Sequence, residues 1–185
     1  MTKTFNIDTH TGLLSAAIFM HSPHQDERPQ ASSIDMIVIH GISLPPGEFG
    51  GHAIEAFFCG HLPVGEHPYF TSIANLKVSA HLLIKRNGDI IQFVPFHKRA
   101  WHAGESQFRG QTRCNDFSIG IELEGTDNEV YEKIQYAQLS SIIRALQQAY
   151  LIPHDRIVGH ADIAPGRKTD PGPFFDWNYL KGTLA

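Results

Sequence analysis

The residues of this sequence that are best suited to chemistry lie near its C-terminus, in residues 159–173. This segment reads GHADIAPGRKTDPGP and contains His160, Asp162, Lys168 and Asp170. Its three prolines predict an irregular loop, because proline fixes its own φ and donates no backbone hydrogen bond. A histidine and a downstream carboxylate in a loop could bind a metal, with a lysine adding positive charge beside them. From these residues alone, a polar surface turn explains the segment equally well.

Two further polar residues belong to apolar runs that predict buried strands. Residues 34–40 (IDMIVIH) end at His40, and residues 117–125 (FSIGIELEG) carry Glu122 in their interior. Open α/β sheets place functional groups at strand ends, although a core histidine bonded to a backbone carbonyl also fits His40. A buried carboxylate is costly unless it is paired, hydrogen-bonded or facing a polar cavity, and the same requirement applies to Glu122.

Together these residue types fit a hydrolytic metal site. Two neutral imidazoles and one carboxylate leave a fourth position for water, which is the pattern of a catalytic zinc site. A carboxylate that is not a ligand could take a proton from that water, and a lysine could stabilise the anion formed on an attacked carbonyl. Glu122 and Lys168 are available for these two tasks. The spacing matches no short motif such as HExxH, so residue types alone leave the zinc site as one hypothesis among others.

Hydrophobic periodicity and turn residues predict the elements that must position these groups. We expect strands at residues 12–20, 34–40, 78–85, 90–94, 117–125 and 156–159, and helices at residues 52–58 and 132–150. The first strand is expected at a sheet edge, Asn87-Gly88 predicts a hairpin between the third and fourth, and Pro153 should end the second helix. Residues 41–51 and 60–67 contain several glycines and prolines, and two loops of this size are typical of a binding rim.

Length and composition are those of an ordinary globular protein. We expect one domain over residues 1–185, since a chain of 185 residues can bury a sizeable core. The net charge of −4, without any run of Lys or Arg, argues against a nucleic-acid or membrane partner. The apolar run of residues 12–20 is too short to span a membrane, and the two distant cysteines fit reduced thiols. We therefore expect a cytoplasmic protein, and the 12 histidines favour metal chemistry.

Several segments, in the same order over most of the chain, resemble one known enzyme family. They are residues 40–51 (HGISLPPGEFGG), 79–81 (SAH), 99–104 (RAWHAG), 113–127 (RCNDFSIGIELEGTD) and 159–173. The family is that of the zinc-dependent N-acetylmuramoyl-L-alanine amidases, which also includes phage-lysozyme-type amidases and peptidoglycan recognition proteins. The longer segments are highly specific, and the sequence is identified as a member of this family.

The resemblance implies a single α/β domain with a central mixed β-sheet flanked by helices. It implies one Zn²⁺ per chain, bound by His40, His160 and Asp170, with Glu122 and Lys168 serving catalysis. The implied reaction is hydrolysis of the amide bond between (1,6-anhydro-)N-acetylmuramic acid and L-alanine of the stem peptide, during peptidoglycan recycling. A small muropeptide is then the expected substrate, and no obligatory protein partner is evident.

Several residues keep two interpretations within this expectation. Asp162 competes with Asp170 as the ligand, and the resemblance favours Asp170 and leaves Asp162 as an acceptor that fixes the loop. Trp101 and His102 are expected against the sugar, with packing at the rim as the alternative. Arg113 suits a carboxylate of the stem peptide, because its guanidinium is a planar bidentate donor, and is otherwise an exposed cation.

One position departs from the family pattern, and two other functions need weighing. Gly41 stands where asparagine is expected after the first histidine, so no side chain is available there to bind substrate or water. A non-catalytic muropeptide-binding module of the same fold is the alternative function, but the ligand set together with Glu122 and Lys168 favours an enzyme. A serine or cysteine hydrolase is disfavoured, because no GxSxG segment occurs and Cys114 has no adjacent base.

Overall fold

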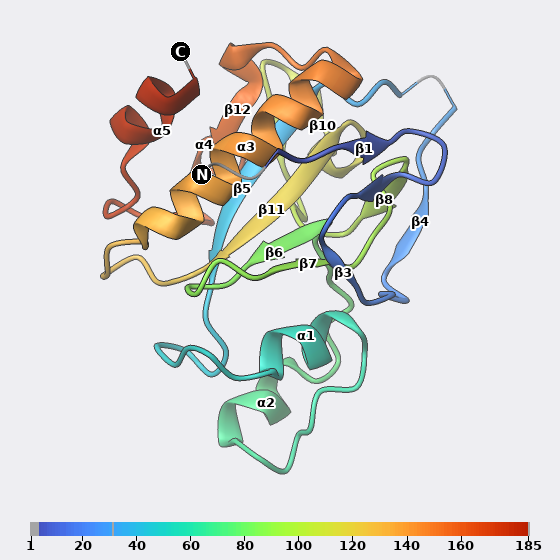
Figure 1. Cartoon of the computed structure of the whole chain (residues 1–185). Helices are drawn as coiled ribbons and strands as arrows, with labels where there is room; N and C mark the ends of the chain where they lie inside the picture. Colours follow the sequence, from blue (N-terminus) through green and yellow to red (C-terminus); the bar gives the residue numbers. More distant parts are fainter. Residues whose placement is uncertain (1–3, 31, 185) are drawn as a thin grey trace.

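A six-stranded mixed β-sheet lies at the centre of the protein (Figure 1) in a computed structural model that describes residues 4–30 and 32–184. The strands, in spatial order, are β12 (Ile157–Gly159), β5 (Met36–Ile42), β11 (Ser118–Glu124), β6 (Leu82–Ile84), β7 (Ile90–Gln92) and β3 (Ile18–Phe19). The first four run parallel, β7 is antiparallel to β6, and β3 is parallel to β7. The expected central mixed sheet is therefore confirmed.

Short strands and helices surround this sheet. Small sheets pair β1 (Ile7–Asp8) with β2 (Leu13–Leu14), β4 (Gln25–Glu27) with β8 (Lys98–Ala100), and β9 (Gln107–Phe108) with β10 (Gln111–Thr112). The helices are α1 (Ala53–Phe58), α2 (Pro68–Ile73), α3 (Lys133–Tyr150), α4 (His160–Ile163) and α5 (Trp177–Leu184), with 3₁₀ turns at Cys114–Asp116 and His154–Arg156.

Side chains of β5 and β11 alternate between the two faces of the sheet. The two strands pair in parallel, with His40 directly opposite Glu122. Ile39 and Ile121 belong to the apolar core beneath α3, and the residues that follow them, His40 and Glu122, point to the opposite face. The alternation places a histidine and a carboxylate next to each other on one face of two otherwise apolar strands.

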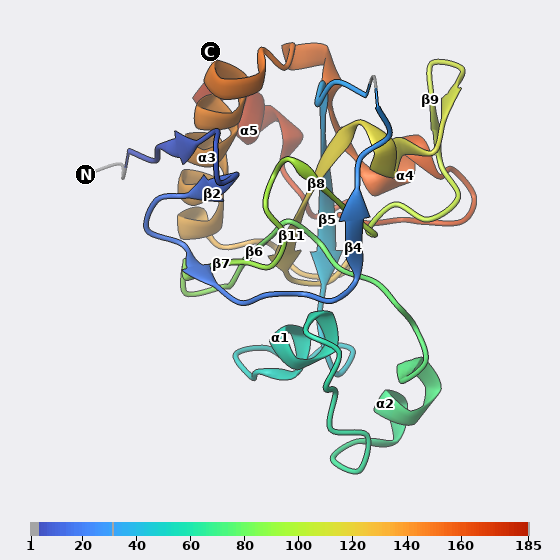
Figure 2. The ribbon, with the colours of Figure 1, turned by 90° about the vertical axis from the view of Figure 1, so that its right-hand side faces the viewer.

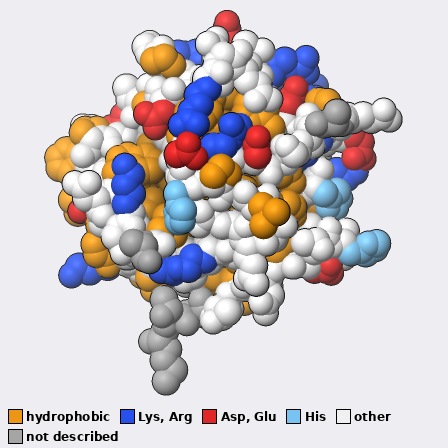
Figure 3. All heavy atoms as spheres, turned by 90° about the horizontal axis from the view of Figure 1, so that it is seen from above, with side chains coloured by type: hydrophobic (Ala, Val, Ile, Leu, Met, Phe, Trp, Pro, Cys, Tyr) orange, Lys and Arg blue, Asp and Glu red, His pale blue; other side chains and the backbone are white. Residues whose placement is uncertain are grey.

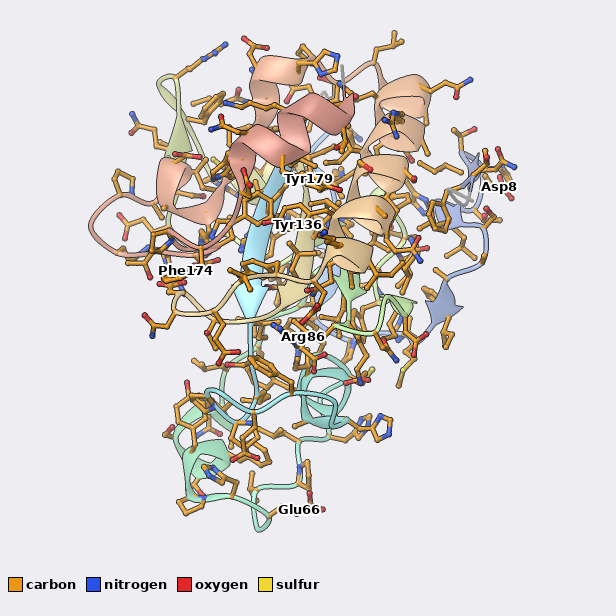
Figure 4. All side chains as sticks on the ribbon, turned by 60° about the vertical axis from the view of Figure 1, so that its left-hand side comes forward. Asp8, Glu66, Arg86, Tyr136, Phe174 and Tyr179 are labelled. Carbon is orange, nitrogen blue, oxygen red and sulfur yellow. The ribbon has the colours of Figure 1, made fainter. Side chains whose placement is uncertain are left out.

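Helix α3 covers the apolar face of the sheet, and α5 packs beside it. A capping box between Glu132 and Gln135 begins α3 and satisfies backbone N–H groups of its first turn. Its buried aliphatic residues are Leu139, Ile142, Ile143 and Leu146. Tyr136 of α3 and Tyr179 of α5 lie side by side, with ring centroids 5.2 Å apart (Figure 4). These two helices hold the rear of the strands that carry the polar residues.

Helices α1 and α2 lie together at the end of the sheet where β5 and β11 finish (Figures 1 and 2). The loop between β5 and α1 is attached to the sheet by two buried charged residues. Glu124 accepts a hydrogen bond from Gly50 N–H at 2.7 Å. Lys85 donates to the carbonyl oxygen of Gly51 at 2.6 Å and to Glu55 of α1 at 2.7 Å. This loop therefore has a defined position next to the carboxyl ends of the strands.

Most predicted elements occur, with shifted ends. The strand expected at residues 34–40 continues to Ile42, because it stays paired with β11, so the placement of His40 at its end was wrong. Of residues 12–20, only Ile18–Phe19 join the main sheet, at its edge. The long helix ends at Tyr150, before Pro153, because Leu151 adopts a left-handed conformation with φ of 57°.

Three short helices were not predicted. Residues 159–173 were expected to form a loop, but His160–Ile163 form α4, since the prolines of the segment come only after this turn. Helices α2 and α5 are six and eight residues long, and such short elements give little periodic signal. The polar residues of the segment are therefore held partly by a helical turn.

Charges of both signs are mixed on the face of the protein that Figure 3 shows. Seen from above the view of Figure 1, Lys and Arg side chains are interspersed with Asp and Glu side chains (Figure 3). Within the described residues, no helix combines the length and apolar character needed to cross a membrane. The cytoplasmic location and the single domain over residues 1–185 stay predictions.

Candidate metal centre

His40, His160 and Asp170 converge on one point. Nδ1 of His40 lies 3.0 Å from Nδ1 of His160, and Oδ2 of Asp170 lies 3.2 Å from the first atom and 3.1 Å from the second. A tetrahedral metal ion with ligands at about 2.0–2.1 Å separates its ligand atoms by about 3.3 Å. The three atoms form a nearly equilateral triangle of that size, so this group could hold a metal ion.

Adjacent parallel strands bring the two histidines together. His40 belongs to β5, and β12 pairs with β5 in parallel, so His160, which directly follows β12, emerges beside it. The chain then returns to the same edge, where Ala161 N–H donates to the carbonyl oxygen of Asp170 at 3.0 Å. Tyr131 supports this return by donating its hydroxyl to the carbonyl oxygen of Pro171 at 2.9 Å.

The protonation of these groups suits a cation. Nε2 of His160 lies 3.2 Å from the carbonyl oxygen of Ala103, which can only accept, so in the neutral ring Nδ1 presents its lone pair. Burial lowers the pKa of His40 to about 4, although the neighbouring Asp170, which would accept a hydrogen bond from the protonated ring, raises it. Burial raises the pKa of Asp170, but the two adjacent histidines, which would donate to it when protonated, outweigh burial and hold it well below its usual range. Neutral imidazoles and an ionised carboxylate are the forms that bind divalent metals.

Asp162 lies outside this group. Its Oδ2 atom accepts a hydrogen bond from Gly159 N–H at 2.7 Å and caps the first turn of α4. In an extended segment Asp162 would point the same way as His160, but the helical turn removes that alignment. The interpretation of Asp162 as an acceptor that fixes the local backbone is confirmed.

Glu122 and Lys168 line the same cavity as the three converging residues, a space of about 790 Å³. The Glu122 side chain is buried, and its Oε2 atom has no hydrogen-bond partner in the described part of the chain. Burial raises the pKa of Glu122 well above its usual value, with the charge of Asp170 adding to this and that of Lys168 opposing it. Lys168 is exposed to the cavity. The Oε2 atom is itself buried, so Glu122 meets the cavity only through the small exposed part of its side chain.

The space next to Gly41 is already occupied. A Cβ atom at this position would lie 2.3 Å from the hydroxyl oxygen of Tyr131 and 3.6 Å from Cα of Pro171. Gly41 also follows His40 in β5 and therefore faces the opposite side of the sheet from it. An asparagine here would require Tyr131 to shift, and the hydroxyl that fills this space already supports the segment carrying Asp170.

Two residues expected to contact substrate lie outside the cavity lining. Trp101 donates its indole N–H to Asp26 at 3.2 Å. Arg113 is an exposed residue of the surface whose Nε lies 3.3 Å from Asp116. Neither belongs to the lining of the 790 Å³ cavity. Contacts of these two residues with substrate stay predictions.

His102 does line the cavity, and the structure adds neighbours that the sequence analysis did not identify. Its two ring nitrogens lie 2.9 Å from Nε2 of His40 and 3.2 Å from Oγ of Ser118. Tyr69 of α2 and Leu76 beyond it are exposed apolar residues that contribute to the cavity wall. The loop composition indicated a rim in this region, but it gave no signal for which side chains face the cavity.

These features define a class of protein: an α/β fold with a candidate metal site and a buried carboxylate in one cavity. The chain belongs to the N-acetylmuramoyl-L-alanine amidase family, whose sequence model matches residues 30–173. The predicted family and the predicted amide hydrolase are therefore confirmed.

Individual relatives match almost the whole chain. The 1,6-anhydro-N-acetylmuramyl-L-alanine amidase AmpD of Escherichia coli (strain K12) is 57% identical over 166 residues, which cover 90% of this chain and 91% of that protein. The crystal structure of a selenomethionine AmpD derivative matches with a TM-score of 0.93 and 52% identity, over 97% of this chain and 99% of its own. The complex of E. coli AmiD with the substrate anhydro-N-acetylmuramic acid-L-Ala-D-gamma-Glu-L-Lys matches with a TM-score of 0.61 and 32% identity. The match covers 85% of this chain and 60% of the AmiD chain.

Proposed function

We propose that this protein is a zinc-dependent amidase that cleaves the bond between 1,6-anhydro-N-acetylmuramic acid and L-alanine of the stem peptide. The observation that carries the proposal is the triangle of His40 Nδ1, His160 Nδ1 and Asp170 Oδ2 in the cavity that Glu122 also lines. Two histidines and one carboxylate leave an open position on a tetrahedral ion, as catalytic zinc sites require. We assign one Zn²⁺ per chain to this group.

The roles of the chain's own residues follow from their positions around this group. Zinc bound here would lower the pKa of water and polarise the scissile carbonyl. Because the charge of bound zinc would favour its ionised form, Glu122, which lines the same cavity, would accept a proton from the attacking water and pass it to the leaving amine. The Lys168 ammonium would stabilise the negative charge that develops on the carbonyl oxygen.

The choice of substrate is supported by the relatives and by the size of the cavity. AmpD of E. coli is named for 1,6-anhydro-N-acetylmuramyl-L-alanine, and AmiD has been captured with an anhydro-muramoyl tripeptide. A cavity of about 790 Å³ is within the range that encloses most of a small ligand. We therefore propose a soluble muropeptide as substrate and peptidoglycan recycling in the cytoplasm as the setting.

The alternative function is a muropeptide-binding module without catalysis. It needs neither a metal nor proton-handling groups, whereas this cavity contains a complete candidate ligand set together with Glu122 and Lys168. The same experiment tests both functions. Purified protein is incubated with anhydro-muramoyl tripeptide, with and without a chelator, and the products are measured by mass spectrometry. Release of free tripeptide that stops on chelation and returns with Zn²⁺ supports the amidase, and intact bound substrate supports the module.

A further inference from the structure

The two proposed histidine ligands direct their second ring nitrogens at one short segment, His102-Ala103. Nε2 of His40 lies 2.9 Å from Nδ1 of His102, and Nε2 of His160 lies 3.2 Å from the carbonyl oxygen of Ala103. Asn115 fixes the backbone of this segment, because its Oδ1 atom accepts the N–H groups of both residues, at 3.2 and 2.8 Å. One dipeptide therefore contacts the outer side of both histidines.

The hydrogen-bond direction along this chain of groups can be worked out from its far end. Oγ of Ser118 lies 2.6 Å from the carbonyl oxygen of Cys114, which only accepts, so the single hydroxyl proton of Ser118 is used there. Toward Nε2 of His102, at 3.2 Å, the Ser118 oxygen must therefore accept. Nε2 of His102 then carries a proton, and Nδ1 of the neutral ring holds a lone pair.

The consequence reaches His40. Since Nδ1 of His102 can only accept, the hydrogen between the two rings belongs to Nε2 of His40. Nδ1 of His40 is then unprotonated and faces His160 and Asp170. We propose that His102 is a positioning residue of the metal centre, which, with its tautomer fixed by Ser118, holds the His40 ring with Nδ1 free to bind metal. The inference rests on the zinc site proposed above.

The His102 ring packs against the backbone of β11 at Gly120, where any side chain would collide with the ring. A Cβ atom at Gly120 would lie 2.4 Å from Cγ and 2.6 Å from Nδ1 of His102. The ring therefore lies directly against a strand position where only glycine fits. Because both of its nitrogens are used inside the protein, His102 has only carbon atoms left to offer a sugar in the cavity. This geometry favours a role in orienting His40 over a polar contact with substrate.

Zinc affinity tests the proposal without relying on activity. His102→Phe removes the acceptor and Ser118→Ala removes the group that fixes the tautomer, and each should weaken zinc binding by about 10- to 100-fold in competition with a chromophoric chelator. His102→Asn, whose side-chain oxygen can accept in place of Nδ1, should recover most of the affinity. Ser22→Ala is the matched control, since Ser22 is as fully buried as Ser118 and donates to the carbonyl oxygen of Phe58. It should bind zinc like the wild type.

Histidine NMR supplies a readout that a purely structural role would not change. In the zinc-loaded wild type with ¹⁵N-labelled histidine, His40 and His102 should each carry their ring proton on Nε2, and Ser118→Ala should shift His102 toward the other tautomer. A proton on Nδ1 of His102 in the wild type would overturn the proposal. Unchanged zinc affinity in folded His102→Phe and Ser118→Ala would overturn it as well, while leaving the zinc site in place. A wild type that binds no zinc would remove both.

Discussion

Glu122 is a buried acid in an apolar strand, with one oxygen that has no partner in the described residues. Burial destabilises the ionised form of such a group, and it therefore raises the pKa of Glu122 well above the usual value. A pKa raised in this way is typical of a carboxylate that exchanges protons with a ligand.

Glu122→Gln should separate catalysis from stability. We expect the variant to fold and hold zinc but to lose turnover by a factor of at least about 10², because an amide cannot accept the proton. Metal content and the release of tripeptide would be measured on the same preparation. Turnover near the wild-type rate in a zinc-loaded Glu122→Gln protein would exclude the catalytic role.

The same substitution predicts a pH effect in metal-free protein. Above about pH 4.3 an unfolded glutamate is ionised, whereas buried Glu122 keeps its proton until its raised pKa is reached. Folding therefore takes up a proton in this window, and the stability of the wild type falls as pH rises through it. Glu122→Gln does not titrate, so its stability relative to the wild type should increase with pH. Urea unfolding in chelator between pH 5 and 8 checks this, and a constant difference would contradict it.

The two aspartates of the segment after β12 should behave differently. Asp170→Ala removes one of the three converging atoms and should abolish tight zinc binding. Asp162→Ala removes only the cap at Gly159, so it should keep zinc and lose about 1 kcal/mol of stability. Metal analysis after gel filtration distinguishes the two, and full zinc occupancy in Asp170→Ala would require another ligand assignment.

At the scale of elements, the central strands could be predicted from the sequence, but the pairing between them could not. The apolar runs around His40 and Glu122 predicted buried strands, because their β-branched residues fit no exposed element. Neither run predicts that His40 and Glu122 lie opposite each other, because the register of the two strands depends on parallel pairing between segments about 80 residues apart. The resemblance supplied the grouping of His40, His160 and Asp170, which spacing alone left open.

The partners that orient these residues gave no signal in the sequence. Ser118 and Asn115 are ordinary polar residues, and their roles depend on a carbonyl oxygen and two N–H groups that only the folded backbone brings near. His102 could be recognised as a candidate, but its hydrogen-bond partners decide whether it faces substrate or His40. Residue types indicate which groups can do chemistry, whereas the hydrogen-bond partners of the two His102 ring nitrogens can be identified only from the structure.

Tyr131 links the start of α3 to the segment that carries Asp170. Its hydroxyl donates to the carbonyl oxygen of Pro171, and its ring lies where a side chain at Gly41 would be. Tyr131→Phe should lower the free energy of unfolding by about 1 to 2 kcal/mol, because a buried carbonyl loses its donor. Urea unfolding measures this, with Tyr179→Phe as the exposed control that should change little. Equal stability of wild type and Tyr131→Phe would show that the bond contributes nothing.

At the scale of the whole molecule, the cavity of about 790 Å³ extends from the strands of the sheet to α2. Its wall combines the charged groups around His40 with the exposed apolar residues Tyr69 and Leu76. A ligand with a sugar, an amide and a charged peptide would find complementary surfaces along such a cavity. The face shown in Figure 3 carries charges of both signs, so it offers no continuous surface of one charge to which a charged polymer could bind.

This arrangement predicts a preference for soluble 1,6-anhydromuramoyl peptides over intact peptidoglycan. A polar group left unpaired in the cavity costs about 1 to 3 kcal/mol, so each lost contact should reduce the rate about tenfold or more. Competition between anhydro and reducing-end muropeptides, and peptide release from insoluble sacculi, would measure the preference. Equal rates on both soluble substrates, or efficient release from sacculi, would indicate a general wall amidase.

Arg113 tests how far the substrate reaches beyond the cavity. Its guanidinium is exposed and lies 3.3 Å from Asp116, outside the cavity lining, so only a stem peptide that extends past the rim could meet it. If it binds a peptide carboxylate, Arg113→Ala should raise KM for anhydromuramoyl tripeptide more than for anhydromuramoyl-L-alanine amide. The exposed pair of Arg109 with Asp155 provides the control, since Arg109→Ala removes a similar surface cation and should leave the ratio of the two KM values unchanged. The same ratio in Arg113→Ala and the wild type would place Arg113 outside the substrate site, and the stem peptide would then be recognised by the cavity residues alone.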